Sequence, residues 1–103
     1  MENLLKNPEV TEIQVVPIKP VNGLVGFASF VLDQSWYFSS IGIFSRPNGS
    51  FRLTYPSKKI GSKSIQIFHP IDKEVGQFIE KVVIKKFEEV TNNYARYSSH
   101  YSE

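Results

Sequence analysis

Five cations lie in the middle third of the chain without a nearby acid. Between Ile41 and Pro70 the sequence has no aspartate or glutamate. The basic residues of this segment are Arg46, Arg52, Lys58, Lys59 and Lys63. Cations that neutralise phosphates release condensed counterions, which gives an affinity that falls steeply with salt and carries little base information. The sequence therefore predicts a phosphate-binding surface for nucleic acid, with a plain solvated loop as the alternative.

The remaining charge is mixed and predicts no second site. Residues 1–40 hold two basic and four acidic residues, residues 71–103 hold five basic and six acidic ones, and the whole chain has a net charge of +2. Lysines and glutamates alternate along the last third, as they do on the solvated face of a helix. Within it, Lys85 and Lys86 are secondary candidates for phosphate contact.

No set of residues for catalysis or cofactor binding emerges. The chain has no cysteine, and its two histidines, His69 and His100, are far apart in the sequence, which is a poor basis for a metal site. A nucleophile with an orienting acid is missing around His69, so a structural hydrogen bond is expected of this side chain. Glycine-rich phosphate loops and Ser-His-Asp spacings are also missing. We predict no enzyme activity, no cofactor, no metal and no small-molecule substrate.

Two aromatic segments are candidate platforms on which nucleic-acid bases could stack. Gly26–Phe30 partly matches the signature of RNA-recognition motifs but lacks its basic start and one stacking aromatic, so coincidence is expected. Trp36, Tyr37 and Phe38 could form a stacking platform for the bases of single-stranded nucleic acid. An aromatic run in a strand more often belongs to a core or a dimer interface, and that is the interpretation we adopt.

The totals describe one small domain. A chain of 103 residues with 41% hydrophobic residues has a single core of marginal stability, which oligomerisation would improve. Met1–Pro8 has no apolar stretch of the kind found in signal peptides, and no segment approaches the roughly 18 to 20 apolar residues of a membrane helix. The absence of cysteine fits a reducing compartment. We therefore expect a cytoplasmic protein with no membrane partner.

The elements that must position the cations are strands followed by one helix. The predicted strands cover Val10–Ile18, Gly23–Leu32, Trp36–Phe44, Phe51–Tyr55 and Ile65–Ile67. Turns are expected at Asn22-Gly23, at Asp33–Ser35 and at Arg46–Gly49, where proline and glycine suit a type I turn. Alternation predicts that Arg52 lies in water and that Ser57–Ser64 forms an exposed basic loop.

From Asp72 the apolar residues repeat every three and four positions as far as Val90, which predicts an amphipathic helix with Asp72 as its N-cap. The predicted fold class is therefore α+β, a five-stranded antiparallel meander with one C-terminal amphipathic helix packed on it. Residues 1–9 are expected to form a flexible extension, 10–91 the single domain and 92–103 a flexible polar tail.

Several segments together resemble a known family. They are Val10–Val15, Asn22–Leu24, Tyr55–Lys59 (YPSKK) and His69–Ile71 (HPI). The resemblance is to the SpoVG (septation protein) family of bacteria, and it runs from about Val10 to Phe87. It implies a dimer formed through the small sheets and regulation through binding of DNA and RNA. The family's basic pair falls on Lys58 and Lys59.

This chain departs from the family in three places, one of which is the run Ile67-Phe68-His69, which is more apolar than the family's usual form. It has about nine additional N-terminal residues, and Ile60–Lys63 replaces an acidic glycine turn, with Lys63 in place of a family arginine. The working hypothesis is a homodimer that binds DNA or RNA through the five central cations. The alternative is a protein-interaction module in the control of septation or sporulation, with exposed aromatic residues as its contact surface.

Overall fold

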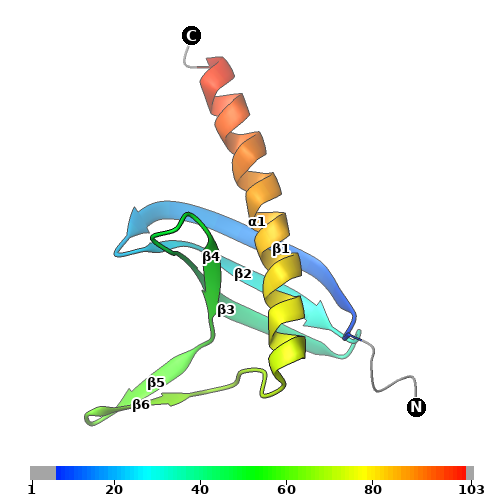
Figure 1. Cartoon of the computed structure of the whole chain (residues 1–103), viewed down its shortest axis with the longest axis vertical. Helices are drawn as coiled ribbons and strands as arrows, with labels where there is room; N and C mark the ends of the chain where they lie inside the picture. Colours follow the sequence, from blue (N-terminus) through cyan, green and yellow to red (C-terminus); the bar gives the residue numbers. More distant parts are fainter. Residues whose placement is uncertain (1–6, 102–103) are drawn as a thin grey trace.

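The computed structural model describes residues 7–101, with side chains as far as Asn92. Its elements are β1 (Val10–Val21), β2 (Leu24–Leu32), β3 (Trp36–Ser45), β4 (Phe51–Thr54), β5 (Ser57–Ile60), β6 (Lys63–Gln66) and α1 (Lys73–Tyr101). Figure 1 shows α1 crossing one face of the sheet and extending past its edge. Residues 1–6 of the predicted extension and 102–103 of the predicted tail lie outside the described residues, so those domain boundaries stay a prediction.

The main sheet is an antiparallel meander of four strands in the order β1-β2-β3-β4. The α+β class with one C-terminal helix is therefore confirmed, whereas the prediction of a fifth strand in this sheet is wrong. The segment predicted as that strand instead contributes to β6, which pairs only with β5. Pro56 follows β4 and has no amide hydrogen to continue the ladder, so the chain leaves the sheet there.

Two β-bulges decide which side chains face the helix. Between Thr11 and Gln14 β1 has one residue more than β2 opposite, and Glu12 takes a φ of 50°. A second bulge in β3 lies between Phe38 and Ile41, where Ser40 has a φ of 62°. A bulge changes the inward and outward alternation of its strand. Phe38 therefore shares the inner face with Ile41.

The second bulge also corrects an expectation for β3. Simple alternation places Tyr37 on the face of Ile41 and Ile43, but both isoleucines are fully buried while Tyr37 is 69% exposed. The fully buried side chains of the core are Phe30, Ile41, Ile43 and Val83. Burial of such groups contributes about 1.5 to 3 kcal/mol each, which makes contact between helix and sheet the main source of stability.

The predicted helix start is confirmed. The Val75 amide nitrogen donates to Asp72 Oδ1 at 3.0 Å, which is the contact of an N-cap residue. Ile79, Val83 and Phe87 then lie one turn apart and are buried against the sheet. No helix among residues 7–101 has the length and apolar character needed to cross a membrane.

Candidate nucleic-acid interface

The segment Ser57–Gln66, hereafter the arm, is a two-stranded hairpin that projects from the sheet. Figure 1 shows β5 and β6 beyond the end of β4, pointing away from the helix. Every residue of both strands is exposed. The arm turns at Gly61-Ser62, where Gly61 has a φ of 62°, and glycine at the first central position of such a tight turn is favoured. The segment predicted as a polar loop is thus a hairpin, and it is exposed as expected.

The cross-strand register distributes the three arm lysines over both faces. Lys58 pairs with Ile65, and Ile60 pairs with Lys63. Successive residues of a strand point to opposite faces, and paired residues point to the same face. Lys58 and Lys63 therefore share one face of the arm, and Lys59 lies on the other.

The two arginines lie on the body of the protein, away from the arm. Arg46 begins the turn between β3 and β4, which the Gly49 amide closes by donating to the Arg46 carbonyl at 2.9 Å. Arg52 is exposed, as predicted, with its guanidinium 5.0 Å from the centre of the Phe44 ring. Such a contact holds a cation over an aromatic face and leaves its hydrogen-bond donors free. The five predicted cations thus form a lysine group and an arginine group at opposite ends of β4.

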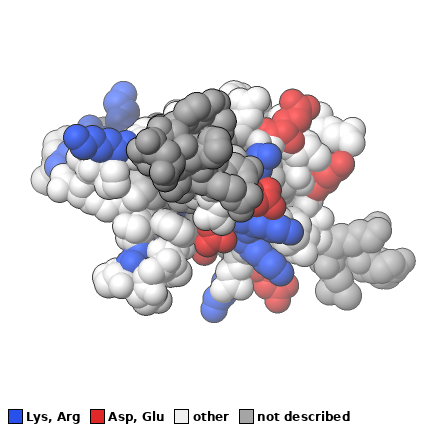
Figure 2. Space-filling view, turned by 90° about the horizontal axis from the view of Figure 1, so that it is seen from above, with Lys and Arg blue, Asp and Glu red and all other residues white. Residues whose placement is uncertain are grey.

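Acidic side chains lie in other parts of the protein. At the start of β1 the Glu9 amide donates to Asp33 Oδ1 at 2.9 Å, and the Asp33 amide donates to the Glu9 carbonyl at 2.8 Å. Figure 1 places this acidic corner across the sheet from the arm. In Figure 2, lysine and arginine side chains lie without acidic neighbours near one edge, while both signs mix on the other side. A polyanion therefore meets least repulsion on the side without carboxylates.

The aromatic candidates divide between core and surface. Phe30 is fully buried and Ala28 is 4% exposed, so among the hydrophobic residues of Gly26–Phe30 only Phe27, at 41%, is on the surface. Trp36 is 62% exposed and lies parallel to Phe38 with ring centres 6.4 Å apart. Because Phe38 also packs edge-on against Phe30, the Trp36 ring extends the core outward.

His69 is exposed, and its Nδ1 lies 3.2 Å from the carbonyl oxygen of Pro70. With a proton on Nδ1, this ring nitrogen donates to the carbonyl, which is the structural role expected for it. The side chain of His100 lies outside the described residues. Among the residues that the structure describes, no three acidic, histidine or cysteine side chains gather closely enough to hold a metal ion.

Sequence reasoning missed the exposed isoleucines of the arm and of the residue that follows it. Ile60, Ile65 and Ile67 are 50 to 61% exposed. Ile60 and Ile65 lie on the same face as Lys58 and Lys63, because the pairs alternate along the hairpin. The signal was the two-residue Gly-Ser connection between alternating segments, which is typical of a tight hairpin.

The sequence is similar to proteins of one known family. The sequence model of the SpoVG family matches residues 8–89. A septation protein SpoVG of Phytoplasma australiense is 30% identical over 86 residues, which cover 82% of this chain and 88% of that protein. The SpoVG protein of Caldicellulosiruptor saccharolyticus is 29% identical over 80% of this chain and 93% of its own length. That of Treponema denticola is 26% identical over 78% and 86%. The resemblance seen in the residues is thus confirmed, and the chain belongs to the SpoVG family.

Proposed function

We propose that this protein is a non-enzymatic, cytoplasmic regulator that binds DNA or RNA as a homodimer, with the arm as its main contact to the phosphate backbone. The observation that carries the proposal is the arm itself. Its strands are exposed on both faces and hold Lys58, Lys59 and Lys63, and the sequence has no acid between Ile41 and Pro70. Nothing in its own segment competes with phosphates for these cations.

The shape of the arm suits a polyanion. Lys63 pairs with Ile60, so Lys58 and Lys63 lie two residue steps apart along the arm, which is about 7 Å at roughly 3.3 Å per residue and close to two phosphate spacings of one DNA strand. Lysines on both faces allow contact with two backbone strands or with one strand that wraps the arm. Arg46, in the turn before β4, and Arg52, within β4, would give a second, separate contact.

A second copy would cover apolar surface that the helix leaves bare. On the face of the sheet opposite α1, Val16 of β1 pairs with Phe27 of β2. Their side chains are 60% and 41% exposed. Tyr37 lies on that face too and is more exposed than either of them. Apolar side chains clustered on an open sheet favour association. A dimer would also present two arms, and two linked contacts raise the overall affinity by avidity.

The test is a charge-matched pair of triple variants. Lys58, Lys59 and Lys63 are changed to alanine in one, and Lys19, Lys73 and Lys81, which are also exposed, in the other. Binding to duplex DNA and to RNA is titrated by gel shift at several salt concentrations. For DNA, we expect the slope of log affinity against log salt to fall by about 0.9 for each phosphate that the arm variant no longer neutralises. The control keeps the slope of the unmodified protein.

Three other outcomes would contradict the proposal. An equal loss of affinity in both variants would mean that only net charge matters. An unchanged slope in the arm variant would remove the arm as the site. If the unmodified protein bound neither nucleic acid even at low salt, the alternative of a protein-interaction module would be favoured. Trp36 and Tyr37, which are exposed on opposite faces of the sheet, would then be the residues to test first.

A further inference from the structure

A small apolar pocket lies where the arm joins the body. It has a volume of about 190 Å³ and lies between the inner face of the sheet, the first turns of α1 and the two segments that connect to the arm. The side chains that matter for its chemistry are Phe30, Phe38, Tyr55, Phe68, Val75 and Ile79. An apolar cavity of about 150 Å³ suffices for a benzene ring. The pocket therefore has room for one ring with a small substituent.

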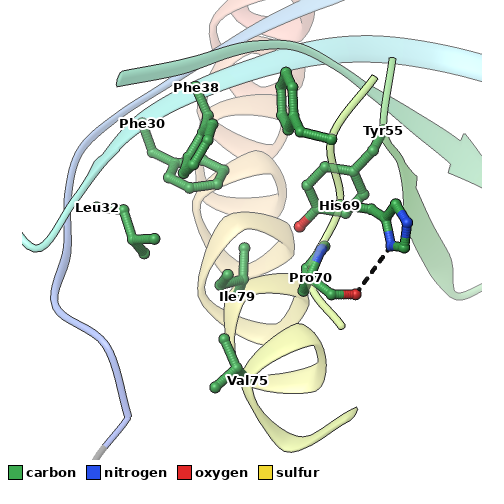
Figure 3. A pocket seen from close by; sticks show the side chains of 9 residues that line it. Phe30, Leu32, Phe38, Tyr55, His69, Pro70, Val75 and Ile79 are labelled. Atoms are coloured by element: carbon green, nitrogen blue, oxygen red, sulfur yellow. Dashed lines mark hydrogen bonds between the residues drawn. The ribbon is translucent and has the colours of Figure 1, made fainter. Parts of the chain in front are cut away.

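Two polar side chains lie at this apolar surface, the Tyr55 phenol and the His69 ring, and the Nδ1 atom of His69 already lies 3.2 Å from the Pro70 carbonyl oxygen. Figure 3 shows the Tyr55 hydroxyl pointing in among the side chains that line the pocket. The hydroxyl oxygen is buried and has no hydrogen-bond partner among the described residues. A buried donor without a partner costs about 1 to 3 kcal/mol, so an acceptor at this point would be stabilising. Small-ligand sites are mostly apolar pockets in which a few polar groups fix the orientation of the ligand.

The surroundings of Tyr55 decide which acceptors fit. Burial, followed by the negative charge of Glu80, raises the pKa of Tyr55 from 10.0 to about 12. The hydroxyl is therefore a protonated donor at physiological pH. The Glu80 carboxylate accepts from the Leu53 amide at 3.1 Å, which positions it near the phenol. An anionic ligand would meet this carboxylate in an apolar surrounding, so a neutral acceptor such as a carbonyl group is favoured.

We propose that this pocket binds a small neutral aromatic compound with one carbonyl-type acceptor, whose ring contacts Phe38, Phe68 and Ile79 while its oxygen accepts from the Tyr55 hydroxyl. Phe38 and Phe68 already pack with ring centres 4.9 Å apart, and Tyr55 meets Phe68 at 6.1 Å. These contacts supply the aromatic walls. The Tyr55 hydroxyl fixes the orientation of the ligand.

A ligand bound in the pocket would affect the arm, because the pocket lies where the arm joins the body. Tyr55 immediately precedes the segment that enters β5, and Phe68 follows the segment that leaves β6. A ligand in contact with both would set the angle of the arm against the body. Any resulting change in nucleic-acid affinity rests on the proposed function, whereas binding of the ligand itself does not.

Three probes of similar size test the chemistry. Acetophenone has the ring and a neutral carbonyl, ethylbenzene lacks the oxygen, and benzoate has an anionic one. Trp36 is the only tryptophan of the chain and stacks on Phe38, so its single indole N–H resonance reports on the pocket. In an NMR titration we expect saturable binding of acetophenone, several-fold to about tenfold weaker binding of ethylbenzene, and no binding of benzoate.

Variants separate the roles of shape and hydrogen bonding. Tyr55→Phe should bind acetophenone and ethylbenzene equally, because only the hydroxyl distinguishes them. Val75→Phe fills the pocket and should bind neither, whereas Val82→Phe, on the same helix but outside the pocket, should bind as the unmodified protein does. The NMR spectrum of each variant verifies that it is folded. If Tyr55→Phe does not fold, the Val75→Phe and Val82→Phe pair decides.

The inference would be overturned if no probe binds, as expected for a pocket filled by water or by a side chain of a second copy. It would also be overturned by equal affinities for acetophenone and ethylbenzene, or by binding that survives Val75→Phe. Failure of the arm lysines to affect nucleic-acid binding would leave this result unchanged. The two proposals can therefore fail separately.

Discussion

The body and the arm both contain antiparallel β-hairpins, but central side chains of the body are buried whereas those of the arm are exposed. In the body, β2 and β3 hold Phe30, Ile41 and Ile43, which are fully buried beneath α1. In the arm, β5 and β6 also alternate and pair in regular register, yet all of their residues are exposed. An isolated two-stranded hairpin is marginally stable in water. The difference teaches that the buried contacts of the body supply the free energy of folding. The side chains of the arm contribute little to it and are exposed for contact with a partner.

The largest expected effect is on the core. Phe30→Ala removes a side chain that is fully buried between sheet and helix, and such truncations destabilise proteins by about 3 to 5 kcal/mol. Ile60→Ala on the arm should change the free energy of unfolding by less than about 0.5 kcal/mol, because Ile60 is 56% exposed. Urea unfolding measures both. Comparable losses of stability would show that the arm packs against something in the monomer.

Two glycines of the body give smaller expected changes in the free energy of unfolding, and the two changes have opposite signs. A Cβ at Gly26 would lie 3.0 Å from both Phe87 Cε1 and the Val16 carbonyl oxygen, so Gly26→Ala should destabilise by about 1 to 3 kcal/mol. A Cβ at Gly76 would meet only Pro70 atoms at ordinary distances of 3.6 and 3.7 Å. Gly76→Ala, within the helix, should therefore stabilise by roughly 0.5 to 1 kcal/mol. Thermal unfolding of the pair checks the opposite signs.

The last effect concerns the junction between the two regions and depends on pH. The pKa of Tyr55 is raised to about 12 in the folded protein, above the 10.0 of the ordinary group. The folded state therefore keeps a proton that the unfolded state loses, so this contribution to stability is present below pH 10 and is lost as the pH rises toward 12. Tyr55→Phe should flatten the alkaline loss of stability. An unchanged pH profile in that variant would refute the role of Tyr55.

Most of the body could be predicted because its signals are local. The Asn22-Gly23 turn, the Asp72 cap and the three-to-four residue period of α1 each follow from short-range sequence chemistry. The bulges could not be predicted, since they depend on Glu12 and Ser40 taking positive φ values that non-glycine residues seldom adopt. Those two residues shift the alternation of β1 and β3 and so decide which side chains enter the core.

The arm and its site were predicted less completely. The absence of acids around the lysines was visible in the sequence, and the polar composition of Ser57–Ser64 predicted that Lys58 and Lys59 are exposed. The break after β4 depends on Pro56, and sequence reasoning gave more weight to continuation of the sheet than to the Gly-Ser turn. The separation of Arg52 from the lysines depends on the path of the chain after that break, which no local pattern specifies.

Lysine footprinting tests the central claim most directly. The unmodified protein is acetylated with and without a saturating DNA duplex or RNA, and the modification of each lysine is measured by mass spectrometry. We predict that nucleic acid protects Lys58, Lys59 and Lys63 several-fold, while Lys73 and Lys81 on the helix react as before. Protection of the helix lysines with an unprotected arm would contradict the claim that the arm is the surface that meets nucleic acid.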